Sequence, residues 1–314
     1  MDCYGLTDTG RRRPTNQDDF LIADLNKSMQ VHSTSLRVGN EAHIYSGSQG
    51  KLLLVADGMG GEIGGERASA IAVGHLTKYV LNSLGWCFRL EEDSEKYFED
   101  DLKEALQYCQ HGIRQVADRE PELKRMGTTM TMVYIVWPRA FVVHVGDSRC
   151  YLLRQRQLNQ ITMDHTMGSI LLQSGRATPD EAGHLPMRHV LWNALGGDSD
   201  DLAVDVYRLS LEPGDVLLLC TDGLYGMVSR DELQSILNSN VSAEAACRRL
   251  IDLANENGGE DNVTAIVTRF RQRHLLEAHV EDKAELDELC GSPAAIADTT
   301  IELKPLTMVG PEED

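Results

Sequence analysis

The sequence predicts an α+β fold built on antiparallel sheets. Six apolar runs rich in Val, Ile, Leu and Thr have the length and composition of buried strands. Amphipathic helical patterns lie between them but do not alternate strictly with them, which disfavours a doubly wound parallel sheet. Short turn sequences separate two pairs of consecutive runs, as hairpins require.

The predicted strands are residues 52–56, 129–136, 140–145, 150–153, 216–220 and 263–270. Residues 137–139 join the second strand to the third, and residues 146–149 join the third to the fourth. We interpret both connections as hairpin turns, because they contain Pro, Gly, Asp and Ser, which are typical turn residues.

Three segments carry the spacing of an amphipathic helix, with apolar residues three, four and seven positions apart. They are residues 66–82, 98–118 and 243–256. Each presents one apolar stripe, so each is expected to pack one face against a sheet.

The 314 residues are 42% hydrophobic, which is enough for a real core. The formal net charge of −19 disfavours capture of nucleic acid or of an anionic membrane. No apolar run reaches the roughly 18–20 residues of a membrane span, and the start lacks a signal peptide's apolar stretch. Seven scattered cysteines without a CxxC pair argue against a disulfide framework or a zinc knuckle, so we expect a reducing cytoplasm.

Acidic residues stand where predicted strands begin or end. Asp57, Asp147 and Asp222 each follow an apolar run, and Asp261 precedes the last one. Asp18 precedes a shorter run near the N-terminus. A single Asp in such a place is usually a turn former or a helix cap. Five of them in facing sheets would gather several carboxylates at one edge.

Clustered carboxylates repel one another unless cations are present, and all-oxygen ligands suit hard ions such as Mg²⁺ or Mn²⁺. Two such ions can lower the pKa of a bridging water and make a hydroxide nucleophile suited to phosphoester hydrolysis. Glycines within 58–65 would let the backbone approach an ion. The basic run at 11–13 could hold a phosphate, although a solvated basic turn is the alternative.

Six motifs follow one another over residues 5–270. They are Arg13-x-x-Asn16-x-Asp18, Ala56-Asp57-Gly58-Met59-Gly60-Gly61, Gly127-Thr128-Thr129, Val145-Gly146-Asp147-Ser148-Arg149, Cys220-Thr221-Asp222-Gly223-Leu224 and Glu260-Asp261-Asn262-Val263-Thr264. In this order they resemble the PPM family of metal-dependent serine/threonine protein phosphatases, also called type 2C. Met59, and the run Asp164-His165-Thr166, resemble the bacterial branch, which has a mobile flap beside its active site.

The resemblance implies two packed antiparallel β-sheets flanked by helices on both outer faces, an α-β-β-α sandwich. It implies a phosphatase domain at 1–270, with a flap at 164–200. Polar composition predicts surface insertions near 26–50 and 85–97 of this domain. Residues 271–314 are expected to be a charged C-terminal extension that is partly disordered.

The resemblance also implies roles for individual positions. The implied metal ligands are Asp18, Asp57, Gly58, Asp147, Asp222 and Asp261. Asp57 would bridge two ions, Asp18 would act through their water shell, and Asp147 would join Asp222 in a third, weaker site. Arg13 would hold the substrate phosphate, so Arg13, Asp57 and Asp222 would form the catalytic set.

Two positions depart from the family's pattern. Gln17 replaces a Glu, which we expect to tune the metal site rather than abolish it. Met59 replaces a His that could protonate the leaving oxygen, so water or a flap histidine, His165 or His184, would have to do so. For both histidines a packing or solvent role is the favoured alternative, and Gly175 is assigned only to the flap.

We therefore predict metal-dependent hydrolysis of phosphoserine and phosphothreonine on proteins by a metal-bound hydroxide. The cofactors would be two Mn²⁺ or Mg²⁺ ions, with a third that binds more weakly. The partners would be phosphorylated proteins and Ser/Thr protein kinases, without nucleic acid or membrane, and the chain would be a cytoplasmic monomer. The alternatives are a catalytically silent phosphoprotein-binding or sensor module on the same fold, or a dedicated regulator of one partner, such as an anti-sigma antagonist.

Overall fold

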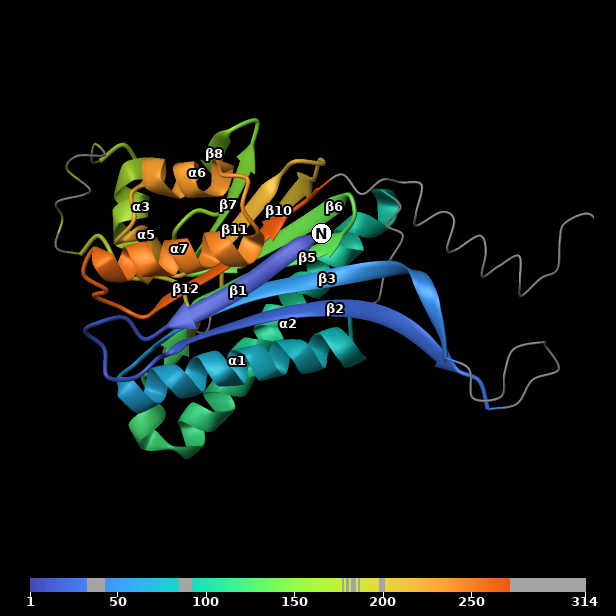
Figure 1. Cartoon of the computed structure of the whole chain (residues 1–314). Helices are drawn as coiled ribbons and strands as arrows, with labels where there is room; N and C mark the ends of the chain where they lie inside the picture. Colours follow the sequence, from blue (N-terminus) through green and yellow to red (C-terminus); the bar gives the residue numbers. More distant parts are fainter. Residues whose placement is uncertain are drawn as a thin grey trace, which may run out of the picture. The chain divides into compact units, whose positions relative to one another are not determined.

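A computed structural model describes residues 1–32, 43–84, 92–176, 178, 181, 185, 187–197 and 201–271. The chain divides into two units. The first consists of Met1–Lys27 and Ser48–Gln272, and the second of Ser28–Gly47 and Arg273–Asp314. In its described part the second unit holds the ends of two long strands, β2 (Asp18–Gln30) and β3 (His43–Met59). Figure 1 shows the helices and strands of the chain.

The first unit contains two antiparallel sheets. One has, in order, the strands β1 (Asp2–Asp8), β12 (Val263–Arg269), β11 (Val216–Cys220), β7 (Arg149–Arg154) and β8 (Gln157–Gln160). The other has, in order, β10 (Asp205–Ser210), β6 (Arg139–Val145), β5 (Met130–Val136), β3, β4 (Gly127–Thr128) and β9 (Leu195–Gly196), with β2 paired to β3. The antiparallel pairing confirms the predicted α+β class.

Helices lie on the outer faces of both sheets (Figure 1). Side chains of α1 (Glu62–Asn82) and α2 (Glu92–Arg119) share a core with β3, β5 and β6. Those of α6 (Arg230–Asn238) and α7 (Ala243–Glu256) share another with β7, β11 and β12. Shorter helices are η1 (Pro121–Leu123), α3 (Met167–Gln173) and α5 (Asp222–Tyr225).

A third apolar core lies between the two sheets, and β3 shows how the sequence builds it. Leu52 and Leu54 face α1 and α2, whereas Leu53 and Val55 face the other sheet. Because successive strand side chains point to opposite faces, a strand buried on both sides is apolar throughout. This layering confirms the α-β-β-α sandwich.

One of the two predicted hairpins is wrong. Residues 137–139 join β5 to β6, which pair as expected. Residues 146–149 instead join β6 to β7, which belong to different sheets. Both strands are apolar on both faces, so their sequences carry no signal for the sheet that each joins. Gly146 makes this sharp connection at φ 105°, and a Cβ there would lie 2.6 Å from Thr129.

The predicted insertions are also partly regular structure. Strands β2 and β3 extend into the segment near 26–50, and residues 33–42 lie outside the described residues. Helix α2 includes residues 92–97 of the second insertion, and residues 85–91 lie outside the described residues. The segment 164–200 contains α3 and β9. The C-terminal extension lies outside the described residues from 272 onwards, and none of the described helices has the length and apolar character needed to cross a membrane.

Phe98 anchors α2 to its sheet and provides a test of this core. The side chain is 2% exposed, and its ring centroid lies 5.1 Å from those of Tyr134 and Phe141. We expect Phe98→Ala to lower the free energy of unfolding by about 3–5 kcal/mol in urea denaturation. Tyr97→Ala, at a neighbouring position that is 76% exposed, should change it by less than about 0.5 kcal/mol. Equal losses in both variants would contradict the packing described.

Candidate active site

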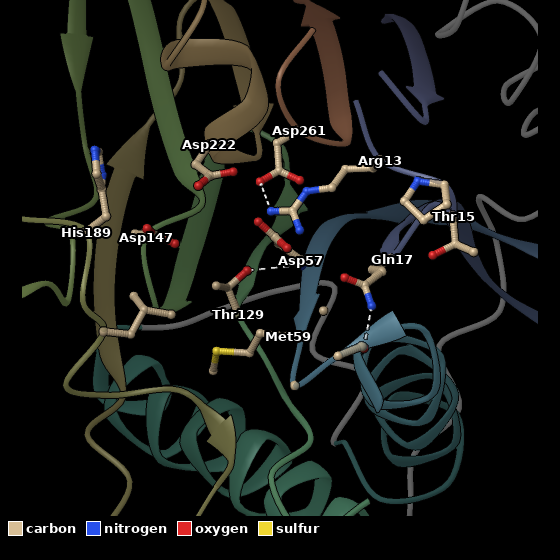
Figure 2. Close-up of a pocket in the computed structure, with 15 residues that line it drawn as sticks. Arg13, Thr15, Gln17, Asp57, Met59, Thr129, Asp147, His189, Asp222 and Asp261 are labelled. Carbon is tan, nitrogen blue, oxygen red and sulfur yellow. Dashed lines mark hydrogen bonds and ion pairs between the residues drawn. The ribbon is translucent and has the colours of Figure 1, made fainter. Parts of the chain in front are cut away.

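Four acidic residues from separate elements meet at one end of the sheets (Figure 2). Asp57 stands near the end of β3, Asp147 in the β6–β7 connection, and Asp222 at the start of α5 after β11. Asp261 lies just before β12. They line a cavity of about 370 Å³. The other lining residues are Arg13, Pro14, Thr15, Gln17, Gly58, Met59, Gly60, Gly61, Thr129, His189 and Leu191.

The backbone around Asp57 is held firmly. The Asp57 N–H donates to the Thr129 hydroxyl at 3.0 Å, and the Asp57 carbonyl accepts from the Thr129 N–H at 2.9 Å. The N–H of Gly58 donates to the Gln17 carbonyl at 3.1 Å. A Cβ on Gly58 would lie 2.1 Å from the carbonyl oxygen of Gly65, so only glycine allows this close approach.

Asp18 lies behind the cavity rather than in its lining. It is 5% exposed, and its Oδ2 accepts hydrogen bonds from the Thr221 and Thr264 hydroxyls, both at 2.7 Å. Its Oδ1 is buried without a hydrogen-bond partner. Asp18 begins β2, whereas Thr264 lies in β12 and Thr221 directly follows β11, so this carboxylate joins the two sheets beneath the site.

The carboxyl groups of the site lie in an environment that disfavours their ionised form. Burial is the main cause that raises the pKa of Asp18 to about 7, of Asp222 to about 6 and of Asp147 to about 8. Burial and repulsion from the neighbouring carboxylates also raise the pKa of Asp57 well above its ordinary value. Among the described residues that line the cavity, Arg13 is the one arginine or lysine.

Arg13 offsets the negative charge of one carboxylate, that of Asp261. Its Nη2 donates to Oδ2 of Asp261 at 2.6 Å, with side-chain exposures of 50% and 34% for the two residues (Figure 2). This hydrogen bond raises the pKa of Arg13. The ion pair lies at the mouth of the cavity, so the guanidinium can leave Asp261 for another anion without being buried.

Contacts of neighbouring side chains hold the backbone around Asp147 in position. The Tyr225 hydroxyl donates to its carbonyl at 3.0 Å. Arg149, two residues on, places Nε and Nη2 on the Asp164 carboxylate at 2.9 and 2.6 Å and lies over the Tyr225 ring. Arg149 thus braces the β6–β7 connection, and it ties this connection to the start of the segment 164–200.

The residues present fit divalent cations. Every acidic side chain in the cavity offers oxygen, which Mg²⁺ and Mn²⁺ prefer. Oδ1 of Asp222 and of Asp18 are buried without hydrogen-bond partners, so negative charge is available for an ion. Within the described ranges, no three His, Cys, Asp or Glu side chains already form a compact ligand set. The carboxylates therefore surround the cavity and would have to close around a bound ion.

The flap residues have structural contacts. His165 is 4% exposed, and its Nδ1 accepts from the Gly146 N–H at 3.1 Å and lies 2.7 Å from Nδ2 of Asn193. Its Nε2 lies 3.2 Å from the Asp205 carboxylate. Both ring nitrogens are thus engaged away from the cavity. Gly175 ends α3 at φ 66°, and His184 lies outside the described residues.

The two departures from the motif pattern both lie in the cavity lining. The Gln17 side-chain amide donates to the Gly61 carbonyl at 2.6 Å, so it holds the glycine loop (Figure 2). Met59 presents a thioether, which cannot donate a proton. Four lining residues, Pro14, Thr15, His189 and Leu191, are not specified by any of the six motifs. His189 and Leu191 lie in a segment without periodic pattern, so nothing in the sequence alone marks them.

Comparison with known proteins agrees with this geometry. A family model described as protein phosphatase 2C matches residues 41–256. The serine/threonine protein phosphatase PstP of Mycobacterium tuberculosis is 37% identical over 232 residues, covering 74% of this chain and 42% of PstP. The protein phosphatase PhpP of Streptococcus pneumoniae is 30% identical over 273 residues, covering 87% of this chain and 98% of PhpP. The chain thus spans less than half of PstP but nearly all of PhpP.

A solved structure shares the fold. It is the catalytic domain of the serine threonine protein phosphatase PstP in complex with two manganese ions, with a TM-score of 0.65 and 31% sequence identity. The similarity covers 86% of this chain and 98% of that one. The chain belongs to the protein phosphatase 2C family, and the resemblance that its motifs predicted is confirmed.

The raised pKa of Asp147 predicts how the metal-free protein responds to pH. Its folded-state pKa of about 8 exceeds the ordinary value of about 3.9. Its contribution to stability is therefore complete below pH ~4 and is lost as the pH rises through about 8. In EDTA, wild type should lose several degrees of melting temperature relative to Asp147→Asn between about pH 6 and 9. The exposed Asp252→Asn is the control, and parallel curves for wild type and Asp147→Asn would contradict the assignment.

The ion pair of Arg13 predicts a competition with cations. Arg13 competes with a cation for the negative charge of Asp261, so Arg13→Gln should raise Mn²⁺ affinity about three- to tenfold in a calorimetric titration without substrate. Arg12→Gln removes the same charge one position away and should raise it less. An Mn²⁺ affinity that is equal in both variants, or lowered in Arg13→Gln, would show that the pair does not compete with the metal.

Proposed function

We propose that this chain is a metal-dependent protein phosphatase that hydrolyses phosphoserine and phosphothreonine on proteins. The observation that carries the proposal is the cavity in which four carboxylates from separate elements face Arg13. Carboxylates suit divalent cations, and a guanidinium suits a phosphate that those cations also attract. Family membership and the names of the relatives support the same reaction.

Each residue has a distinct role in this proposal. The cation ligands would be Asp57, the Gly58 carbonyl, Asp222 and Asp261. Two divalent cations bound there would supply a water of lowered pKa for attack on phosphorus and would screen the charge of the substrate. Asp18 supports the ligands from behind through water. Arg13 turns from Asp261 to the phosphate and orients it bidentately for in-line attack.

The leaving serine or threonine oxygen must receive a proton. Met59 has none to give, and both ring nitrogens of His165 are engaged with other groups. We infer that a water in the cavity donates it. Gln17 keeps the glycine loop in place through Gly61 and changes the charge near the cations without removing a ligand.

Further assignments complete the proposal. Asp147, with Asp222, forms a third and weaker cation site, because both line the same cavity. Either Mg²⁺ or Mn²⁺ fits an all-oxygen ligand set. The phosphatase domain spans 1–270, and 271–314 form an extension. The chain works as a cytoplasmic monomer that opposes Ser/Thr kinases, and free thiols at five described cysteines support a reducing compartment.

Two other functions are disfavoured. A silent phosphoprotein-binding module would have no use for the full set of acidic ligands. A dedicated regulator of one partner would catalyse the same reaction but act on a single substrate protein. It therefore differs from the proposed function only in the number of substrates.

Phosphate release from phosphothreonine peptides tests the proposal most simply. Release should require Mn²⁺ or Mg²⁺ and stop in EDTA, while the same peptides with phosphotyrosine should react far more slowly. No release with either metal would overturn the proposed activity.

Asp57 should be indispensable for turnover. We expect Asp57→Asn to lower metal-dependent kcat by about 10³-fold or more, because its charge holds both cations. The variant should still fold, and its melting temperature in EDTA should equal or exceed that of wild type because one repelling charge is gone. Asp252→Asn is the control, and full activity of Asp57→Asn would remove the metal-bridging role.

Arg13 should act mainly on substrate binding. We expect Arg13→Ala to raise KM for a phosphopeptide more than it lowers kcat, because the phosphate contact exists before the transition state. Arg13→Lys should rescue only in part, since lysine lacks the bidentate fork. An unchanged KM in Arg13→Ala, together with a raised KM in Arg12→Ala, would move the phosphate contact to Arg12.

A further inference from the structure

A second cavity lies at the opposite ends of β11 and β12 from the acidic site. Its volume is about 410 Å³, and its lining includes Asp215, Asn240, Arg269 and Arg271. The lining residue Val216 begins β11, and Arg269 ends β12. No residue of this cavity lines the acidic one.

Arg269 is an unusual arginine. It is 8% exposed, and its Nη1 donates to the Leu237 carbonyl in the last turn of α6 at 3.0 Å. Its Nε and Nη2 are buried without a hydrogen-bond partner. These two N–H groups lie on the same edge of the guanidinium, which is the edge that grips an oxyanion with two parallel hydrogen bonds.

Two other arginines of this chain show what that edge does when it is paired. Arg149 places Nε and Nη2 on Asp164 at 2.9 and 2.6 Å. Arg154 places the same two atoms on Asp215, also at 2.9 and 2.6 Å. In Arg269 the same two atoms, Nε and Nη2, have no carboxylate partner among the described residues.

The acidic groups near Arg269 are already engaged. Asp2, opposite Arg269 in the sheet, is paired with Arg271 at 3.3 Å. Asp215 is paired with Arg154. Burial, together with the charge of Arg271, lowers the pKa of Arg269, in keeping with a poorly compensated cation. A buried donor without a partner is destabilising, so an oxyanion at this edge would satisfy both donors and the charge.

We propose that this cavity binds a small oxyanion, a phosphate or a carboxylate group, with Arg269 as its bidentate anchor: its unpaired Nε–Nη2 edge, buried in this structure, turns towards the cavity when the anion binds. Arg271, whose charge is shared with Asp2, and Asn240 also line the cavity. The site is separate from the acidic centre in residues and in place, so its existence does not depend on the proposed phosphatase activity.

The test uses the full chain with Arg13→Ala, in EDTA, so that the acidic site does not bind the probe. Inorganic phosphate and acetate are titrated separately by calorimetry, at constant ionic strength set with chloride. We expect one saturable binding event, weakened at least tenfold by Arg269→Gln. Arg269→Lys keeps the charge but not the fork, and should weaken it as well. Arg271→Gln should have a smaller effect.

The outcomes separate the possible ligands. Binding of phosphate but not acetate assigns the site to phosphate groups, and binding of both assigns it to oxyanions in general. Circular dichroism checks that each variant is folded. If Arg269→Gln is unfolded, the comparison of anion affinity is made between wild type and Arg269→Lys. Binding of neither anion, or binding that both Arg269 variants leave unchanged, overturns the proposal and leaves the two donors to water.

Discussion

The fold is organised around one electrostatic constraint, which is the burial of several carboxylates at one end of two stacked sheets. Desolvation and mutual repulsion raise the pKa values of Asp18, Asp57, Asp147 and Asp222. Such a cluster lowers the stability of the metal-free fold. Other contacts must offset this loss of stability when no cation is bound. They include the hydrogen bonds that pin the backbone next to Asp57 and the ion pair of Arg13 with Asp261.

The same end of the molecule holds the two sheets together. Asp18, on β2, accepts hydrogen bonds from Thr264 of the other sheet and from Thr221, which directly follows β11 of that sheet. The β6–β7 connection crosses from one sheet to the other beside it, and His165 fixes that connection through the Gly146 N–H. The positions of the acidic side chains are therefore set by contacts between sheets rather than within one strand, which is how distant sequence motifs come to share one cavity.

Much of this could be predicted from the sequence, and the reason is visible in β3. Its apolar run is buried on both faces and is followed directly by Asp57, so the sequence marks both the strand and the acidic residue at its end. Strands β1 and β10 were not predicted, because they lie at sheet edges with partly buried residues and weak apolar signal. The Arg13–Asp261 ion pair and the unpaired Nε and Nη2 of Arg269 depend on contacts between residues more than thirty positions apart. Local sequence patterns carry no information about such contacts.

Cations replace protons in this cluster, and proton release on metal binding measures the exchange directly. Calorimetric Mn²⁺ titration in buffers of different ionisation enthalpy counts the protons displaced. With the pKa values of Asp222 at about 6 and of Asp18 at about 7, binding at pH 6.5 should release about one proton or more. The number should fall as the pH rises past about 8, the pKa of Asp147. Mn²⁺ binding without proton release anywhere between pH 6 and 8 would show that these carboxylates hold no protons for the metal to displace.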